Sequence, residues 1–147
     1  MRVLVDTNVL LRSAQPSHPF FFQGSESIAR LLEQHHQLFF CPQNIVEFWS
    51  VATRPVAQNG LGLTQPKLLK EIASIEKSLT LLPDSSEIYE AWKRIAANHQ
   101  VLGAKVHDAR LVAVMTVYGV ENILTFDASD FNRYASIRVL SPSSVVA

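Results

Sequence analysis

The sequence has only one cysteine, Cys41, among its 147 residues. No disulfide can form within the chain, so a reducing environment is expected, and the lack of paired Cys/His spacings argues against structural zinc. The apolar run that precedes Asp6 is only three residues long, Val3–Val5, which is too short for a signal peptide, and no apolar run approaches a membrane span. We therefore expect a cytoplasmic protein that has no membrane partner.

An excess of charge of one sign is also missing. Thirteen basic residues balance 13 acidic ones, so the chain lacks a wide cationic surface, and any contact with phosphate groups must be local. A glycine-rich phosphate loop is absent, which argues against a nucleoside-triphosphate enzyme, and so is a Gly-x-Ser-x-Gly serine elbow. Apolar residues make up 48% of the chain and charged residues 18%, as in ordinary folded proteins. We expect residues 1–147 to form a single domain.

Short apolar runs alternate with segments of helical periodicity along most of the chain. The apolar runs predict strands at residues 2–5, 38–41, 80–82, 122–126 and 137–140. The periodic segments predict helices at residues 9–14, 25–35, 42–54 and 106–118, and others that start at Thr64 and at the capping-box sequence Asp84–Glu87. This alternation predicts right-handed crossovers and a parallel sheet with helices on both faces.

Four acidic side chains occupy comparable places in this predicted fold. Asp6 and Asp127 directly follow buried strands, Asp108 lies in the first turn of a buried helix, and Glu47 lies within a mostly apolar helix. Strand carboxyl ends and the amino ends of the following helices share one edge of such a sheet. Each acid also has a simpler interpretation: a helix cap for Asp6, a helix-dipole partner for Asp108, and a solvent-facing position for Glu47.

Carboxylates that meet at one edge repel one another unless some are protonated or a cation lies among them. Oxygen-only ligand sets favour hard divalent ions, so the pattern predicts Mg²⁺ or Mn²⁺. An ion of this kind, open on one side, polarises a phosphodiester and acidifies water. The chemistry implied is metal-assisted hydrolysis of a phosphate ester; one ion or two, and Mg²⁺ or Mn²⁺, remain open.

Polar and basic side chains complete the candidate site. Thr7 and Asn8 directly follow Asp6 and can donate hydrogen bonds to it, and Asn8 is also placed to cap the first helix. Asn44 shares a helical stripe with Glu47. The candidates for local phosphate contacts, any of which can equally be a solvated surface residue, are Arg12, Arg54, Lys105, Arg110 and Arg133.

Three further features allow more than one interpretation. The run Phe20–Phe22 lies in the predicted loop 15–24, where it either packs partly over the core or meets a partner chain. The helix from Thr64 is a second plausible partner or dimer surface. Trp92 is interpreted as a core residue rather than as a platform for stacking bases.

Four segments resemble the motifs of PIN-domain nucleases, in the same order and over essentially the whole chain. They are Val-Leu-Val-Asp6-Thr7-Asn8-Val-Leu, Asn-Ile-Val-Glu47, His-Asp108-Ala-Arg-Leu-Val-Ala and Leu-Thr125-Phe-Asp127-Ala-Ser-Asp130-Phe. Within that family they look most like the VapC-like toxins of bacterial toxin–antitoxin pairs. The resemblance implies a three-layer α/β/α fold and Mg²⁺- or Mn²⁺-dependent cleavage of RNA. It also implies a homodimer that a small antitoxin protein inhibits.

The resemblance assigns roles to individual residues. By that likeness, the metal-binding and catalytic acids are Asp6, Glu47, Asp108 and Asp127, and their supporting hydrogen-bonding residues are Thr7, Asn8 and Thr125. Asp130 fits the last acidic position as well as Asp127 does. We therefore expect an endoribonuclease, whose RNA target the sequence does not identify.

Two alternative functions remain open. The first is a non-catalytic module with the same fold that binds RNA or protein. The second is a phosphatase or phosphotransfer domain with Asp6 as its nucleophile. The second is disfavoured because such enzymes usually have another acid where this chain has Asn8.

Overall fold

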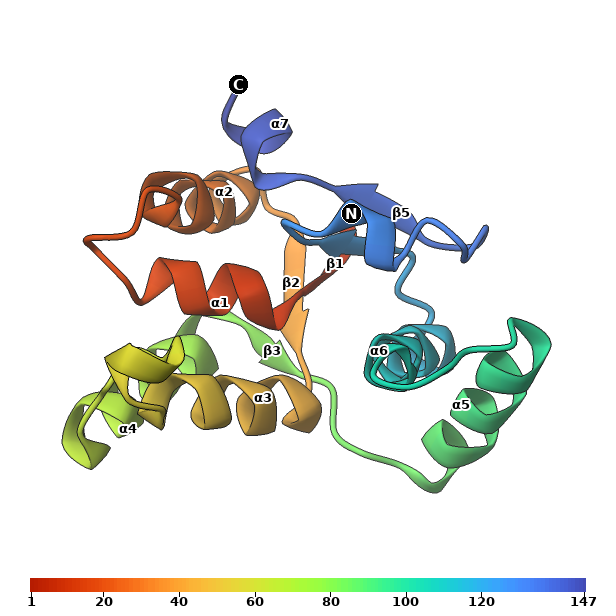
Figure 1. Ribbon diagram of the computed structural model, residues 1–147. Helices are drawn as coiled ribbons and strands as arrows, with labels where there is room; N and C mark the ends of the chain where they lie inside the picture. The colour runs from red at the N-terminus through yellow and green to blue at the C-terminus, as the bar shows by residue number, and fades with distance from the viewer.

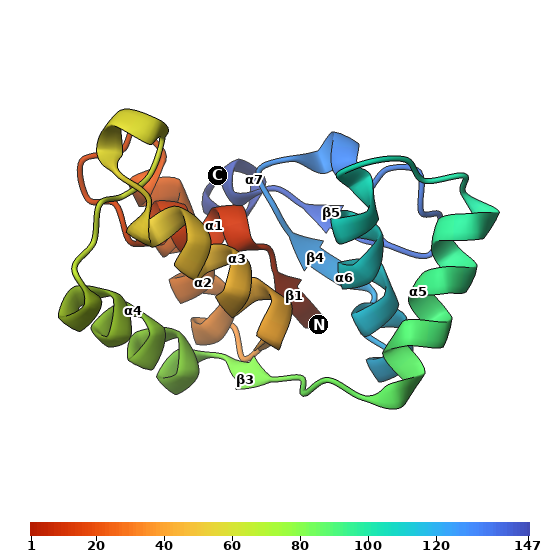
Figure 2. The ribbon, with the colours of Figure 1, turned by 60° about the horizontal axis from the view of Figure 1, so that its bottom comes forward.

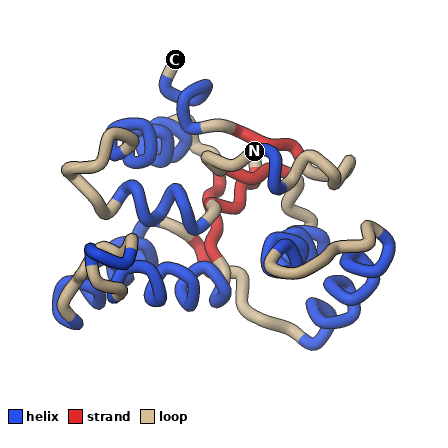
Figure 3. Tube along the Cα trace, viewed as in Figure 1, coloured by secondary structure: helices blue, strands red, loops and turns tan.

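The computed structural model describes residues 1–147 and contains a five-stranded sheet with the strand order β3-β2-β1-β4-β5. All four pairs of neighbouring strands are parallel, which confirms the predicted sheet. Figures 1 and 3 show the strands in the middle of the molecule with helices on either side. The strands are β1 (Arg2–Val5), β2 (Gln37–Phe40), β3 (Thr80–Leu81), β4 (Asn122–Leu124) and β5 (Arg138–Leu140).

Helices cover both faces of this sheet, which gives the predicted three-layer α/β/α fold. They are α1 (Thr7–Ser13), α2 (Phe21–Glu33), α3 (Pro42–Thr53), α4 (Gln65–Ser78), α5 (Ser86–Asn98), α6 (Lys105–Tyr118) and α7 (Pro142–Val146), with 3₁₀ turns η1 (Val56–Gln58) and η2 (Ala128–Asp130). Helices α1 to α4 pack on one face with one apolar cluster, and α5 and α6 pack on the other face with a second cluster (Figures 1 and 2). None of the helices combines the length and apolar character needed to cross a membrane.

The central strand β1 contributes to both clusters. Val3 and Val5 point into the α1–α4 cluster, whereas Leu4 points into the α5–α6 cluster, and all three are fully buried. Both faces of a parallel sheet are covered, so its strands are apolar at every position rather than at alternate ones. Val5 pairs with Leu124 of β4, so β1 and β4 end at the same level and the residues after them lie side by side.

Helix α2 begins at Phe21, earlier than the predicted start at residue 25, and it includes Gly24. A Cβ atom at Gly24 would lie 3.3 Å from both the Arg12 Cβ and the Ser13 Oγ, so the missing side chain lets α1 and α2 approach closely. The prediction of a loop over the whole phenylalanine run is therefore wrong, because Phe21 and Phe22 form the first turn of α2.

The aromatic residues divide between core and surface. Phe20 is 47% exposed but stacks on Phe126, with ring centroids 5.4 Å apart, whereas Phe22 is 61% exposed. Trp92 packs against the α5–α6 cluster and donates its indole N–H to the Val106 carbonyl oxygen at 2.9 Å. The core interpretation of Trp92 is therefore confirmed, while Phe22 remains uncovered.

Candidate active site

The carboxyl ends of β1 and β4 bring Asp6 and Thr125 together. Asp6 directly follows β1, and its backbone N–H donates to the Leu124 carbonyl oxygen at 2.9 Å. Thr125 directly follows β4, and its hydroxyl donates to Asp6 Oδ2 at 2.7 Å. Two residues that are 119 positions apart in the chain therefore form a direct hydrogen bond within the fold.

Asp6 is both a buried acid and the N-cap of α1. Its Oδ1 accepts the Thr7 backbone N–H at 2.8 Å, and only 7% of the residue is exposed. Burial raises the pKa of Asp6 from 3.8 to about 7, although hydrogen bonds from Thr125 and Thr7 lower it. The nearby charges of Asp108 and Glu47 raise this pKa further. Negative charge on Asp6 is therefore costly in the absence of a cation.

Asn8 connects α1 to the chain that follows β4. The prediction that Asn8 caps this helix is wrong, because Asp6 is the cap and Asn8 is the second residue of α1. Asn8 Nδ2 donates to Thr125 Oγ1 at 3.1 Å and to Asp127 Oδ2 at 3.3 Å. Its Oδ1 accepts the Phe126 N–H at 3.2 Å. Asn8 thus orients Asp127, which follows β4, rather than Asp6, which follows β1.

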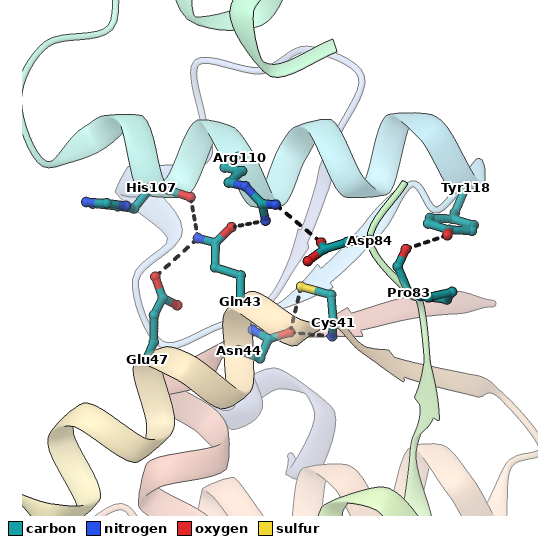
Figure 4. Close-up of polar contacts among 9 residues, drawn as sticks. All are labelled: Cys41, Gln43, Asn44, Glu47, Pro83, Asp84, His107, Arg110 and Tyr118. Atoms are coloured by element: carbon teal, nitrogen blue, oxygen red, sulfur yellow. Dashed lines mark hydrogen bonds and ion pairs between the residues drawn. The ribbon is translucent and has the colours of Figure 1, made fainter. Parts of the chain in front are cut away.

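Helix α3 places Glu47 against the start of α1. The Thr7 hydroxyl donates to Glu47 Oε1 at 2.8 Å and accepts the Asn44 Nδ2 at 3.1 Å. Asn44 is fully buried, and its Oδ1 accepts the Cys41 N–H at 2.9 Å (Figure 4). Glu47 is therefore not simply a solvent-facing residue, because the hydrogen bonds from Asn44 to Thr7 and from Thr7 to Glu47 hold one of its carboxylate oxygens.

Gln43 is a site residue that the sequence interpretation missed. Its Nε2 donates to Glu47 Oε2 at 3.2 Å and to the His107 carbonyl oxygen at 2.8 Å, and its Oε1 accepts an Arg110 N–H at 3.1 Å (Figure 4). Gln43 therefore connects the acid of α3 to the first turns of α6. The available signal was its position four residues before Glu47, a spacing at which helical side chains meet.

The predicted capping box at Asp84 does not form. Ser85 is the N-cap of α5 and makes no side-chain capping bond. Asp84 instead accepts an Arg110 N–H at 3.2 Å, while the Tyr118 hydroxyl donates to the Pro83 carbonyl oxygen (Figure 4). The segment before α5 is therefore fastened to α6 rather than to its own helix.

Asp108 lies in the first turn of α6, is half-buried and accepts no hydrogen bond within the chain. Burial raises the pKa of Asp108 from 3.8 to about 6, and the charge of Asp130 raises it further. Lys105 opposes this rise in the pKa, whereas Glu47 and Asp127 add to it. The carboxylate of Asp108 is thus unpartnered among other acids, which is how an acid that binds a cation would lie.

Asp127 and Asp130, which the sequence pattern did not separate, have different partners. Asn8 donates to Asp127 Oδ2, while Lys105 forms an ion pair with Asp130. Both acids act on the pKa of Asp108, so both lie near it. We use the name acidic edge for Asp6, Glu47, Asp108, Asp127 and Asp130.

The basic candidates lie in different places. Lys105 and Arg110 belong to the first two turns of α6, beside the acidic edge. Arg12 lies in the last turn of α1, and Arg54 follows the last residue of α3, so each lies at the helix end remote from the acids. Arg133 is exposed in the chain after η2 and makes no ion pair. The fold therefore places Lys105 and Arg110 beside the acids, and Arg133 lies near Lys105, whose pKa is raised by its acidic partner and lowered by the charge of Arg133.

The donor set at the acidic edge has the chemistry of a hard-cation site. No three acidic, histidine or cysteine side chains lie close enough to form a complete cage. Mg²⁺ does not need one, because it keeps several waters and is typically held by one or two carboxylates and substrate phosphate oxygens. The raised pKa values of Asp6 and Asp108 mean that ionising these carboxyl groups is unfavourable, and a bound cation would make it favourable. The residues therefore fit Mg²⁺ or Mn²⁺ as water-rich ions.

The order of these acids along a parallel sheet can be compared with known families. The family model described as the PIN domain matches residues 3–137. The chain belongs to the PIN domain family. A comparison with curated proteins found no match.

Several solved structures share the fold of this chain. VapBC-1 from nontypeable Haemophilus influenzae has 13% identity and a TM-score of 0.71, and the match covers 97% of this chain and 99% of that one. VapBC2 from Rickettsia felis, bound to a promoter DNA fragment, has 10% identity and a TM-score of 0.70, covering 96% and 98%. Mycobacterium tuberculosis VapC20, a sarcin-ricin loop cleaving toxin, has 15% identity and a TM-score of 0.66, covering 92% and 98%. At these sequence identities the similarity is evidence for a shared fold alone.

Proposed function

We propose that this PIN domain is a Mg²⁺- or Mn²⁺-dependent endoribonuclease that hydrolyses RNA phosphodiesters. The observation that carries the proposal is the placement of Asp6 and Asp108, which are 102 positions apart in the sequence yet lie close enough for the charge of Asp108 to raise the pKa of Asp6. Buried acids are usually paired with a base, whereas the charges that act on Asp6 are those of other acids, and three acids outnumber Lys105 around Asp108. A shared divalent cation is the simplest reason for an arrangement of this kind.

Each acid of the site has a proposed role. Asp6 and Asp108 would hold the ion, and Glu47 and Asp127 would complete its surroundings directly or through water. When bound, the ion would stabilise negative charge on the phosphate and make water a better nucleophile. Thr7 and Thr125 hold the two Asp6 oxygens in place.

Three neighbouring side chains would orient or balance these acids. Asn8 donates to Asp127, and Gln43 donates to Glu47, so each would fix the orientation of one carboxylate. Asp130 would stay paired with Lys105. An acid that is free of the ion would then accept the proton of the attacking water.

RNA is the substrate that best fits the local charge and the family. The few basic side chains near the acids are Lys105, which is paired with Asp130, Arg110, which is paired with Asp84, and Arg133. So small a set suits contact with one or two phosphates rather than a long cationic track. VapC20, which shares this fold, is described as a toxin that cleaves the sarcin-ricin loop. That likeness supports RNA as the polymer without identifying the cleavage sequence.

We also propose that the chain is the toxin of a toxin–antitoxin pair. Several structures with this fold are VapBC or FitAB assemblies, which supports a small antitoxin protein as a partner. The cytoplasm is the proposed location, and residues 1–147 are proposed to act as a single nuclease domain. A homodimer is proposed as well; Phe22 and Leu69 of α4 are exposed apolar residues that a second copy would cover.

The test is incubation of purified, partner-free protein with total cellular RNA, with and without Mn²⁺, followed by mapping of the product ends. Discrete new ends are expected only when the cation is present. Asp108→Asn is expected to abolish cleavage with little loss of stability, because the wild-type carboxylate accepts no hydrogen bond within the chain. Cleavage by Asp108→Asn at the wild-type rate would refute the proposed roles.

A non-catalytic binding module is the second candidate, and the absence of a complete cage of acids favours it. A module of this kind would bind RNA or protein equally well in EDTA and would produce no new RNA ends. An excess of chelator in the cleavage reaction therefore separates the two candidates, since only an enzyme has an activity to lose.

A further inference from the structure

A pocket of about 450 Å³ lies next to the acidic edge, between α5 and the beginning of α6. Figure 2 shows these two helices side by side on one face of the sheet. The lining residues that matter are Tyr89 and Trp92 from α5 and His107 and Arg110 from α6. The volume falls in the usual range of ligand sites, about 300–1,000 Å³.

The α5 side of the pocket is aromatic. Tyr89 is 58% exposed, and its ring lies 6.4 Å from the ring of Trp92 at an interplanar angle of 40°. The indole of Trp92 packs against the core and donates its N–H to Val106, so the ring that is open to a ligand is that of Tyr89. An open tyrosine ring beside a partly buried indole is a suitable wall for a planar aromatic ligand.

The α6 side of the pocket carries the guanidinium of Arg110, which is ion-paired with Asp84. Arg110 uses one N–H for Gln43 and another for Asp84, which leaves three of the five guanidinium N–H donors free. These two contacts also hold the guanidinium in one place (Figure 4). A fixed guanidinium with free donors is well suited to binding a phosphate oxygen.

The pocket and the acidic edge are connected through one side chain. His107 and Arg110 line the pocket, whereas Asp108, which lies between them in the sequence, does not line it and instead lies among the acids. Gln43 contacts both sides, since it donates to the His107 carbonyl oxygen and to Glu47. A nucleotide in the pocket would therefore place an adjoining phosphate near the acids.

We propose that this pocket is a nucleobase subsite, in which Tyr89 stacks on one unpaired base of the RNA and Arg110 binds the phosphate beside it. This inference rests on the proposed function and adds to it a base-binding position next to the cleaved bond. A balanced net charge gives little nonspecific attraction to RNA, so base stacking supplies affinity that a cationic surface would otherwise provide. The free donors of Arg110 favour a phosphate-bearing ligand over an apolar peptide.

The test compares Tyr89→Leu, which removes the aromatic ring, with Tyr89→Phe, which keeps it. Binding of a labelled single-stranded oligoribonucleotide is measured in EDTA, so that no cleavage is needed. We expect Tyr89→Leu to weaken binding about tenfold and Tyr89→Phe to leave it unchanged, as loss of one stacked base predicts. In a Trp49→Phe background, Trp92 is the one remaining tryptophan, and its emission should change when RNA binds.

A substrate that lacks the base next to the cleavage site provides the matched control. Wild type should bind this abasic RNA about tenfold more weakly, and Tyr89→Leu should lose nothing further, because the two changes remove the same contact. Equal RNA binding by wild type and Tyr89→Leu, or no binding by either, would overturn the subsite. The subsite would also be overturned if Tyr89→Leu bound RNA normally but no longer bound a protein partner.

Failure of the subsite can be distinguished from failure of the nuclease proposal. Cation-dependent cleavage by Tyr89→Leu with an unchanged KM would remove the subsite and leave the nuclease intact. RNA binding in EDTA that depends on Tyr89, without any cleavage when Mn²⁺ is added, would keep the subsite and remove the nuclease.

Discussion

The hydroxyl of Thr125 donates to Asp6 at 2.7 Å and accepts two N–H groups, one from the Asn8 side chain and one from the Asp127 backbone. The single hydroxyl proton and both lone pairs of Thr125 are therefore in use. One buried hydroxyl joins the acid that follows β1 to the chain that follows β4. The Thr125 side chain thus affects the ionisation of one acid and the placement of another.

Thr125→Val should reduce both stability and activity at neutral pH. Valine has a similar shape but leaves Asp6 without its donor and two N–H groups without their acceptor, so the free energy of unfolding should fall by about 2 kcal/mol. In wild type the hydrogen bond from Thr125 lowers the pKa of Asp6, so its loss should raise that pKa. The pH at which the cleavage rate rises should therefore move upward. Urea unfolding and pH–rate curves measure the two effects. Thr125→Ser keeps the hydroxyl and should resemble wild type; an unmoved pH curve in Thr125→Val would contradict the argument.

The metal-free protein should lose stability as pH rises. The ordinary pKa of an aspartate is 3.8, and folding raises that of Asp6 to about 7. Between pH 3.8 and about pH 7, the folded state therefore keeps a proton that the unfolded state has released. Stability is then highest at low pH and falls by about 1.4 kcal/mol per pH unit until about pH 7, from this group alone. Thermal melts in EDTA at about pH 5 and about pH 8 should differ by roughly 5–10 °C.

Asp6→Asn is the variant that isolates this group. Asparagine does not titrate, so the variant should lack the pH dependence that binding of about one proton gives to the free energy of unfolding. The variant should also be more stable than wild type at about pH 8. An equally steep slope in wild type and Asp6→Asn would mean that other groups cause the pH dependence.

Much of this architecture was predictable from local sequence pattern. Asp6, Asp127 and Asp108 were located because an acid that directly follows an apolar run, or opens a buried helix, has a defined place in a parallel sheet. The start of α2 was not predictable in this way. Gly24 looks like a helix breaker in sequence, yet it is needed where α1 and α2 approach, and that contact exists only in the fold.

The partners of polar side chains were harder to predict than the positions of the acids. Asp84 has the spacing of a capping residue, but Arg110 from another element competes for its carboxylate. Gln43 looks like an ordinary surface residue of a helix until α6 places His107 and Arg110 beside it. Contacts between elements distant in sequence decide such cases, and periodicity along one helix does not contain them.

Gln43→Met should impair catalysis more than stability. Methionine has a similar length but makes none of the three hydrogen bonds that hold Glu47 to α6, so Glu47 should become mobile. We expect kcat to fall about tenfold, with a loss of about 1 kcal/mol in the free energy of unfolding. The measurement is cleavage kinetics with urea unfolding, and Gln34→Met, at the exposed end of α2, is the matched control. A normal kcat in Gln43→Met would show that Glu47 needs no such support.

Divalent cations should stabilise the protein, and more strongly at high pH than at low pH. An ion and a proton compete for Asp6 and Asp108, whose pKa values are raised to about 7 and about 6, so at about pH 5 protons occupy much of the site. Millimolar Mn²⁺ should therefore raise Tm by several degrees at about pH 8 and by little at about pH 5. Na⁺ at equal ionic strength controls for screening, and Glu121→Gln, before β4 at the opposite end of that strand, is the control acid. Asp108→Asn should lose most of the Mn²⁺ effect while Glu121→Gln keeps it; an equal effect in both variants would place the ion elsewhere.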